Sequence, residues 1–142
     1  MKFKKLELVG FKSFFDRTTF FIQEGLTGIV GPNGCGKSNI VEALRWCMGE
    51  TSAKSMRGSG MEDIIFSGTS NKPAKNISEV NITIDNSQKE GPGKYLDMEE
   101  IIIKRKIEIN ISITVSFIGI NKQKIKNETI PITIDSIVAT VR

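Results

Sequence analysis

The chain has 142 residues, 39% hydrophobic and 25% charged, a balance typical of one soluble globular domain. The net charge of +4 permits contact with a phosphate backbone without arguing for it, and the absence of histidine excludes Ser-His and Cys-His nucleophile systems and every histidine metal site. No apolar run approaches the roughly 18 residues that span a bilayer, so we expect a cytoplasmic protein with no membrane contact.

Apolar patterning predicts three strands and a helix in the first third of the chain. Residues 5–9 alternate, and residues 17–22 form a second extended run. Residues 26–30 are almost wholly apolar, which is typical of a strand buried on both faces. Residues 37–48 show helical spacing and are followed by a stop signal at Gly49. The expected buried stripe of this helix consists of Ile40, Val41, Leu44 and Met48. The face expected to point away carries Asn39, Glu42 and Arg45.

The rest of the chain predicts mainly strands. Residues 50–60 and 67–75 are polar loops, and residues 61–66 are an apolar-acidic piece of undetermined type. Strands are predicted where apolar and polar residues alternate, at residues 80–85, 101–109 and 111–117. Asn121-Lys122 could turn a hairpin after the last of these, although Lys122 would resist a positive φ.

One motif carries chemistry: residues 31–38, GPNGCGKS, match the phosphate-binding loop (P-loop) pattern G-x-x-x-x-G-K-[ST]. Glycines let the backbone turn back and aim several N–H groups at one point. The following helix adds unpaired amides and a dipole that is worth only about 0.3–1 kcal/mol. Tight triphosphate binding therefore depends on the amides together with Lys37, which would reach the β- and γ-phosphates. The Ser38 hydroxyl would ligate Mg²⁺.

The candidate ATP-binding residues are the loop, the asparagine after it and a pair that follows the first strand: Gly31, Pro32, Asn33, Gly34, Cys35, Gly36, Lys37, Ser38, Asn39, Lys12 and Ser13. Arg57 lies alone between small residues, where a solvated surface arginine is the simpler interpretation. Three basic groups could touch DNA phosphates, but they lack interleaved aromatic residues and a groove-reading helix, so solvated strand edges are favoured. These groups are Lys72 and Lys75, then Lys104, Arg105 and Lys106, then Lys122, Lys124 and Lys126. No residue is assigned a catalytic role.

The chain resembles the start of bacterial SMC (structural maintenance of chromosomes) chromosome-segregation ATPases. The matching pieces keep the family's order and spacing: LELVGFKSF (6–14), LTGIVGPNGCGKSNIVEALRWCMGE (26–50), SAKSMRG (52–58), MEDIIFSGT (61–69) and EVNITIDN (79–86). Transporter ATPases and RecN-like and RecF-like proteins share the P-loop but not the run from SAKSMRG to MEDIIFSGT. The resemblance is therefore more specific than a P-loop alone.

The resemblance implies an α/β fold, the N-terminal half of an ABC-type ATPase head, with a P-loop strand and helix beside an antiparallel sheet. It implies ATP and Mg²⁺ as ligands of residues 31–38, with Lys12 and Ser13 beside the nucleotide. In the family, an arginine at the position of Arg57 links DNA or the partner head to ATP hydrolysis. The implied partners are DNA, a second SMC head, ScpA and ScpB, in the cytoplasm at the nucleoid.

Several family features are not found in residues 1–142: the coiled coil, the hinge, a recognisable Q-loop, and the C-terminal head half with its signature motif, Walker B acids and catalytic glutamate. Residues 101–127 still resemble the family's β-hairpin, but the tail from about residue 128 departs from the pattern. We expect a truncated, frame-disrupted or split gene product. Whether it acts as an enzyme is left open, and without the missing acids we expect weak ATP binding and no turnover.

Three functions stay open at this point: a head segment that works with a complementing half, a nonfunctional relic, or a stand-alone nucleotide-binding module. The missing half would normally add strands and cover apolar surface. We therefore expect an incomplete core, with residues 111–117 as an exposed edge strand liable to aggregate.

Overall fold

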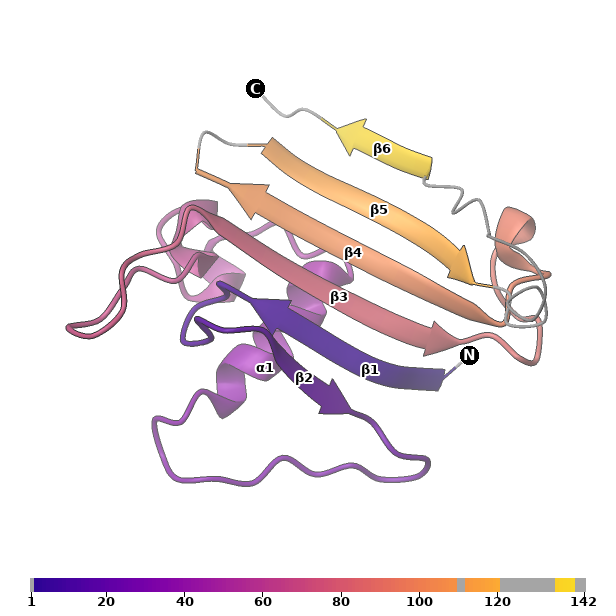
Figure 1. Ribbon diagram of the computed structural model, residues 1–142, viewed down its shortest axis with the longest axis horizontal. Coiled ribbons are helices and arrows are strands. Elements are labelled where there is room, and N and C mark those ends of the chain that lie inside the picture. The colour runs from indigo at the N-terminus through magenta and orange to yellow at the C-terminus, as the bar shows by residue number, and fades with distance from the viewer. Residues whose placement is uncertain (1, 110–111, 121–134, 140–142) are drawn as a thin grey trace.

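The fold is seen in a computed structural model that describes residues 2–109, 112–120 and 135–139, and it is built on one antiparallel sheet (Figure 1). The six strands lie in the order β2-β1-β3-β4-β5-β6, and every neighbouring pair is antiparallel. Their bounds are β1 Lys2–Val9, β2 Thr18–Phe21, β3 Ile77–Asp85, β4 Glu100–Glu108, β5 Ser112–Ile120 and β6 Asp135–Ala139. The strands expected from alternation are thus confirmed, with bounds that shift by a few residues.

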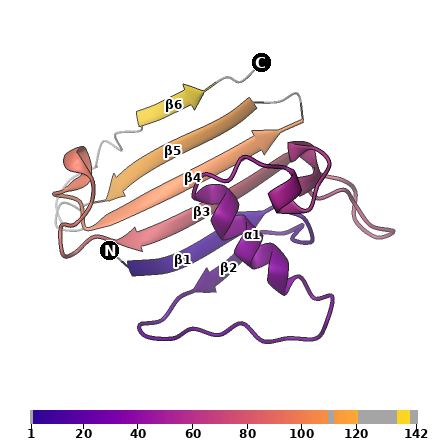
Figure 2. The same ribbon diagram turned by 180° about the vertical axis from the view of Figure 1, so that it is seen from behind.

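Helix α1 (Lys37–Cys47) lies across one face of this sheet, over β3 and β4 (Figure 2). The chain also forms three short 3-10 turns. Two follow α1, η1 (Lys54–Met56) and η2 (Met61–Ile64), and the third, η3 (Gly93–Tyr95), lies between β3 and β4. The piece at residues 61–66, whose type the sequence left undetermined, therefore begins as a 3-10 turn. Within the described part of the chain, no helix is long and apolar enough to cross a membrane.

The core lies between α1 and the covered face of the sheet. The strand register aligns Leu6 with Ile82, and Ile82 with Ile103, so one face collects apolar side chains across β1, β3 and β4. The opposite face carries ion pairs such as Lys104 with Glu79, whose nitrogen and oxygen are 2.7 Å apart. One apolar and one charged face is the expected outcome of period-two alternation in an antiparallel sheet.

The helix face that packs on the sheet differs from the predicted stripe. Ile40 is buried as expected and Leu44 is partly buried, but Val41 and Met48 are exposed. The remaining buried residues of α1 are Glu42, Ala43, Trp46 and Cys47. The observed buried face is rotated around the helix axis by about one residue from the predicted face, and both faces are compatible with the helical period of 3.6 residues. The face with the large indole of Trp46 packs inward because it buries more apolar area.

The predicted strand at residues 26–30 is wrong. This segment forms no ladder in the structure, and it belongs to a long loop that leaves β2 and swings away from the sheet before α1 (Figure 1). Its side chains are open to solvent, with Leu26 98% and Val30 94% exposed. A strand needs a neighbour for its N–H and C=O groups, and no described strand pairs with these residues. The apolar composition is therefore present without the partner that would make it a strand.

The expectation that residues 111–117 form an edge strand is also wrong. Strand β5 lies inside the sheet, paired with β4 on one side and with β6 on the other. The edges of the described sheet are β2 and β6. The Asn121-Lys122 turn lies outside the described residues. Strand β6 belongs to the tail that was expected to depart from the family pattern.

A buried arginine joins the sheet to the end of α1. Arg105 occupies the core face of β4, where its guanidinium lies 4.9 Å from the Trp46 ring. Its Nη1 donates to the carbonyl oxygens of Trp46 and, at 2.9 Å, Glu50. These bonds satisfy carbonyls at and beyond the C-terminus of α1, where a cation also meets the negative end of the helix dipole. Burial lowers the pKa of Arg105 from its ordinary value, and burial raises the pKa of the neighbouring Cys47 thiol to about 12.

Replacing Gly10 by alanine is expected to destabilise the fold by about 2–3 kcal/mol. Gly10 ends β1 with φ 64°, and a Cβ there would collide with the backbone oxygen of Ile77. Urea unfolding would measure the loss. Gly25→Ala is the matched control, because Gly25 has φ 83° but open space around it, so strain alone costs about 1 kcal/mol. Equal losses in the two variants would contradict the collision.

Candidate phosphate-binding site

The P-loop turns through two glycines and runs straight into α1. Gly34 has φ 81° and Gly36 has φ 91°, both in the left-handed region that favours glycine. Gly36 is the N-cap of α1 and offers no side-chain acceptor, so the first amides of the helix have no side-chain cap. The free N–H groups of an uncapped helix N-terminus can donate hydrogen bonds to an anion. The predicted glycine loop and helix are thus in place, without the predicted strand before them.

The ammonium of Lys37 lies against the loop. Its Nζ donates to the carbonyl oxygens of Gly31 and Pro32, each 2.6 Å away, and lies 3.9 Å from the Cys35 sulfur. These acceptors are neutral carbonyls, so they hold the cation without cancelling its charge. A phosphate group is a stronger partner for an ammonium than a neutral carbonyl. The uncapped helix and this cation together fit a phosphate.

The metal assignment rests on Ser38, which is exposed at the second position of α1. The described residues contain no group of three or more His, Cys, Asp or Glu side chains that could hold a metal ion. Mg²⁺ commonly takes one or two protein ligands and fills its octahedral shell with waters and phosphate oxygens. Ser38 is thus suited to hold Mg²⁺ only together with a bound phosphate.

Two predicted neighbours, Ser13 and Asn39, meet beside the loop. The Asn39 amide nitrogen donates to Ser13 Oγ at 2.9 Å, which ties the loop after β1 to the first turn of α1. Ser13 also lies close to the backbone of Gly36, since a Cβ on that glycine would be 2.6 Å from Ser13 Oγ. Glycine therefore suits position 36 for two reasons: the positive φ, and the close approach of Ser13, which leaves no room for a side chain. The structure thus brings Ser13, Gly36 and Asn39 together at the start of α1.

Lys12 and Arg57 both contact α1 at Glu42, a residue that the sequence pattern assigned to the outer face of this helix. Both cations pair with Glu42, Lys12 through one carboxylate oxygen and Arg57 through the other. Lys12 also donates to the Met56 carbonyl oxygen, and Arg57 Nη2 donates to Asn39 Oδ1 at 2.8 Å. Glu42 was missed because its charge favoured an exposed position. The available signal was its place one helical turn after Ser38, on the same face.

The candidate DNA-contact groups are mostly engaged locally. Lys104 pairs with Glu79, Lys106 pairs with Glu108, and Arg105 is buried. Lys72 pairs with Asp16 at 2.5 Å. Lys72 and Lys75 both lie over the Phe15 ring, with nitrogens 4.6 and 4.0 Å from its centre, so this group does have an aromatic neighbour. Lys122, Lys124 and Lys126 lie outside the described residues.

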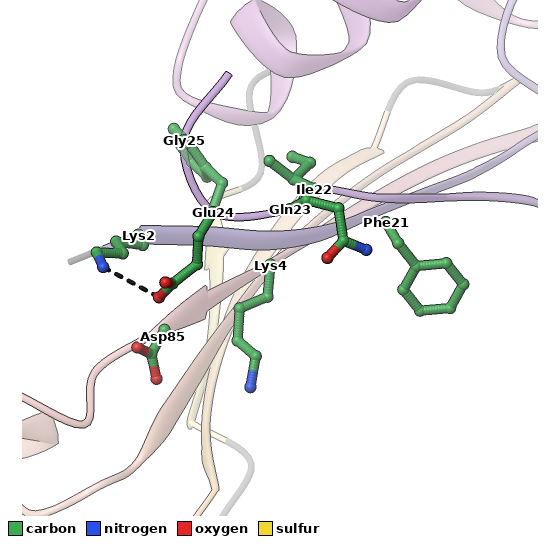
Figure 3. A pocket seen from close by; sticks show the side chains of 9 residues that line it. Lys2, Lys4, Phe21, Ile22, Gln23, Glu24, Gly25 and Asp85 are labelled. Atoms are coloured by element: carbon green, nitrogen blue, oxygen red, sulfur yellow. Dashed lines mark hydrogen bonds and ion pairs between the residues drawn. The ribbon is translucent and has the colours of Figure 1, made fainter. Parts of the chain in front are cut away.

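A separate hollow of about 640 Å³ opens near the start of the chain (Figure 3). Its wall includes Lys2 and Glu24, whose charged atoms are 3.1 Å apart, together with the exposed Phe21. None of the P-loop residues, and neither Lys12 nor Arg57, lines it. The hollow therefore has no part in the phosphate site.

Comparisons with known proteins point to one family. A family model described as RecF/RecN/SMC N terminal domain matches residues 2–138. Chromosome partition protein Smc of Rhodopseudomonas palustris is 56% identical over 108 residues, which cover 76% of this chain. The match covers 9% of that relative, so the chain spans about a tenth of the length of such proteins.

Solved SMC heads share the fold. A chain from a study of ATP-driven dimerization and DNA-stimulated activation of SMC ATPases has a TM-score of 0.78 and 35% identity, covering 84% of this chain and 71% of that one. The Smc head from Pyrococcus furiosus, bound to the C-terminal domain of ScpA, has a TM-score of 0.77 and 37% identity. The match covers 84% of this chain and 29% of the Pyrococcus furiosus chain. At these identities the likeness extends beyond fold to sequence.

Proposed function

Because the chain belongs to the RecF/RecN/SMC N-terminal domain family and has the fold of the N-terminal segment of an SMC head, we propose that it binds ATP and Mg²⁺ through residues 31–38 as part of a chromosome-partition protein. The observation that carries this proposal is the meeting of the Lys37 ammonium, the glycine turn and an uncapped helix N-terminus at one place. Each of the three attracts an anion, and together they suit a polyphosphate.

Each residue has a separate task in this proposal. Lys37 neutralises the β- and γ-phosphates, the amides of the loop and of the first turn of α1 donate to phosphate oxygens, and Ser38 supplies one oxygen to Mg²⁺. Asn39, Lys12 and Ser13 support the rim of the site. When bound, ATP with Mg²⁺ supplies a phosphoryl group whose hydrolysis can drive a change of shape. The hydrolytic acids are expected elsewhere than in residues 1–142, so this segment by itself binds without turnover.

The exposed segment at residues 26–30 supports the proposed partner, a complementing C-terminal head half. Its apolar side chains and unpaired backbone suit a strand that another segment would complete. On the model of the solved heads, we further propose pairing with a second SMC head and binding of ScpA, and by family analogy ScpB and DNA at the nucleoid. Arg57, half exposed beside the P-loop, is the residue proposed to link DNA or the second head to the nucleotide.

Saturating ATP–Mg²⁺ is expected to stabilise the folded chain by about 2.7 kcal/mol when the ligand is at 100 times its Kd. The measurement is the free energy of unfolding in urea, with and without nucleotide. AMP with Mg²⁺ is the matched control, since it keeps the adenosine but lacks the β- and γ-phosphates that Lys37 would reach. No shift with ATP, or an equal shift with AMP, would count against the P-loop assignment.

A further inference from the structure

The most deeply buried carboxylate next to the phosphate site is that of Glu42, which lies outside the P-loop pattern at residues 31–38. Glu42 is only 6% exposed, although it lies on a helix next to solvent-facing loops. Both carboxylate oxygens are engaged, one by Lys12 and one by Arg57. Burying an unpaired carboxylate costs several kcal/mol, so this residue is tolerated only because two cations converge on it.

The two cations approach from strained backbones. Lys12 has φ 48° and Arg57 has φ 55°, in the left-handed region where residues with a Cβ pay about 1 kcal/mol or more. Such strain persists only where the surroundings fix it. Lys12 N donates to Ile64 O at 2.7 Å, and Arg57 N donates to Lys54 O at 3.1 Å. Among the described residues, Glu42 pairs with both side chains, so its carboxylate is a shared reason for both conformations.

From Glu42 the connection continues to the phosphate loop. Arg57 bonds Asn39 at 2.8 Å, Asn39 bonds Ser13 at 2.9 Å, and Ser13 lies against Gly36. Arg57 uses two of its five N–H donors in these contacts, and its side chain is 56% exposed, so other donors stay accessible to an anion. The guanidinium is thus held at the rim of the P-loop by one carboxylate and one amide.

We propose that Glu42 is a positioning residue of the phosphate site, whose buried carboxylate holds the Arg57 guanidinium beside the P-loop and locks the Lys12 and Arg57 loops onto α1. The ligand served is the polyphosphate of a bound nucleotide, so the proposal rests on the proposed function. Glu42 itself does not touch the ligand, because its oxygens are taken by the two cations. Its negative charge also offsets the repulsion between Lys12 and Arg57.

Two measurements on the full 142-residue chain test this, with Glu42→Gln as the variant and Glu62→Gln, an exposed glutamate in η2, as the matched control. The first is trypsin cleavage after Arg57, read by mass spectrometry against cleavage after the exposed Lys89. Glu42→Gln is expected to raise the Arg57 rate about tenfold while leaving Lys89 unchanged, because only the local opening becomes easier. Glu62→Gln should change neither rate.

The second measurement is the Kd for ATP–Mg²⁺, taken at a temperature where every variant is folded. Glu42→Gln is expected to weaken binding about tenfold, and Arg57→Ala combined with it should weaken binding no further than Arg57→Ala alone, since both act through one guanidinium. A merely structural Glu42 would instead lower stability, speed cleavage at both sites and leave the Kd unchanged, and that result overturns the proposal.

The experiments can contradict the positioning role of Glu42 without contradicting ATP binding, and the reverse. If wild type binds ATP but Glu42→Gln binds equally well, the positioning role is wrong and the proposed function stands. If wild type binds no ATP, the proposed function fails, and the cleavage experiment alone decides whether Glu42 holds Arg57. Unchanged cleavage after Arg57 in Glu42→Gln then overturns the positioning role as well.

Discussion

Replacing Lys37 by alanine is expected to abolish the stabilisation by ATP–Mg²⁺, a loss of about 2.7 kcal/mol at ligand concentrations 100 times the wild-type Kd. The reason is charge. Lys37 supplies the ammonium at the P-loop, held there by the carbonyl oxygens of Gly31 and Pro32. Loop and helix amides alone provide partial charges, and a helix dipole is worth only about 0.3–1 kcal/mol toward an anion.

The same variant should fold almost normally without ligand. The bonds of Lys37 run to neutral carbonyls in an exposed loop, so we expect its free energy of unfolding to fall by no more than about 1 kcal/mol. Urea unfolding with and without ATP–Mg²⁺ measures both effects. Lys54→Ala, which removes an exposed lysine from η1, is the matched control and should keep the ATP shift. An undiminished shift in Lys37→Ala would mean that ATP binds elsewhere.

Replacing Trp46 by alanine is expected to cost about 3–5 kcal/mol of folding free energy. Trp46 is fully buried, its ring centre lies 5.8 Å from that of Phe11, and Arg105 stacks on it from the sheet. The substitution would leave a cavity and would also remove the aromatic face against which a buried cation rests. Whole domains are stable by only about 5–15 kcal/mol, so this variant is expected to be near its folding limit.

Far-UV circular dichroism in urea is the measurement, because Trp46 is the single tryptophan and its fluorescence is lost with it. Trp46→Phe provides the comparison that stays folded. It keeps an aromatic face for Arg105, and the indole Nε1 that it removes has no hydrogen-bond partner in the described structure, so a loss of about 1–2 kcal/mol is expected. A loss below about 1 kcal/mol in Trp46→Ala would show that α1 does not depend on this contact.

Local sequence patterns were enough to predict five of the six described strands, β1 to β5, together with the helix at residues 37–47 and the glycine turn before it. These depend on periodicity and on backbone freedom, which are local properties, and a positive φ at Gly34 and Gly36 needs no distant partner. The resemblance to SMC heads, drawn from the order of several motifs, is confirmed by the family and structure comparisons. ATP and Mg²⁺ binding, DNA contact and the role of Arg57 stay predictions.

Which neighbours these elements have depends on contacts between distant parts of the chain. The run at residues 26–30 has a strand's composition but no strand beside it, so it lies exposed in a loop. The sequence pattern places Glu42 and Arg105 on the surface, yet both are buried. Glu42 pairs with Lys12 and Arg57, and Arg105 bonds the end of α1, and all these partners lie far away in the chain. Periodicity states which residues can share a face. Whether that face is covered, paired or neutralised depends on long-range contacts that no local pattern contains.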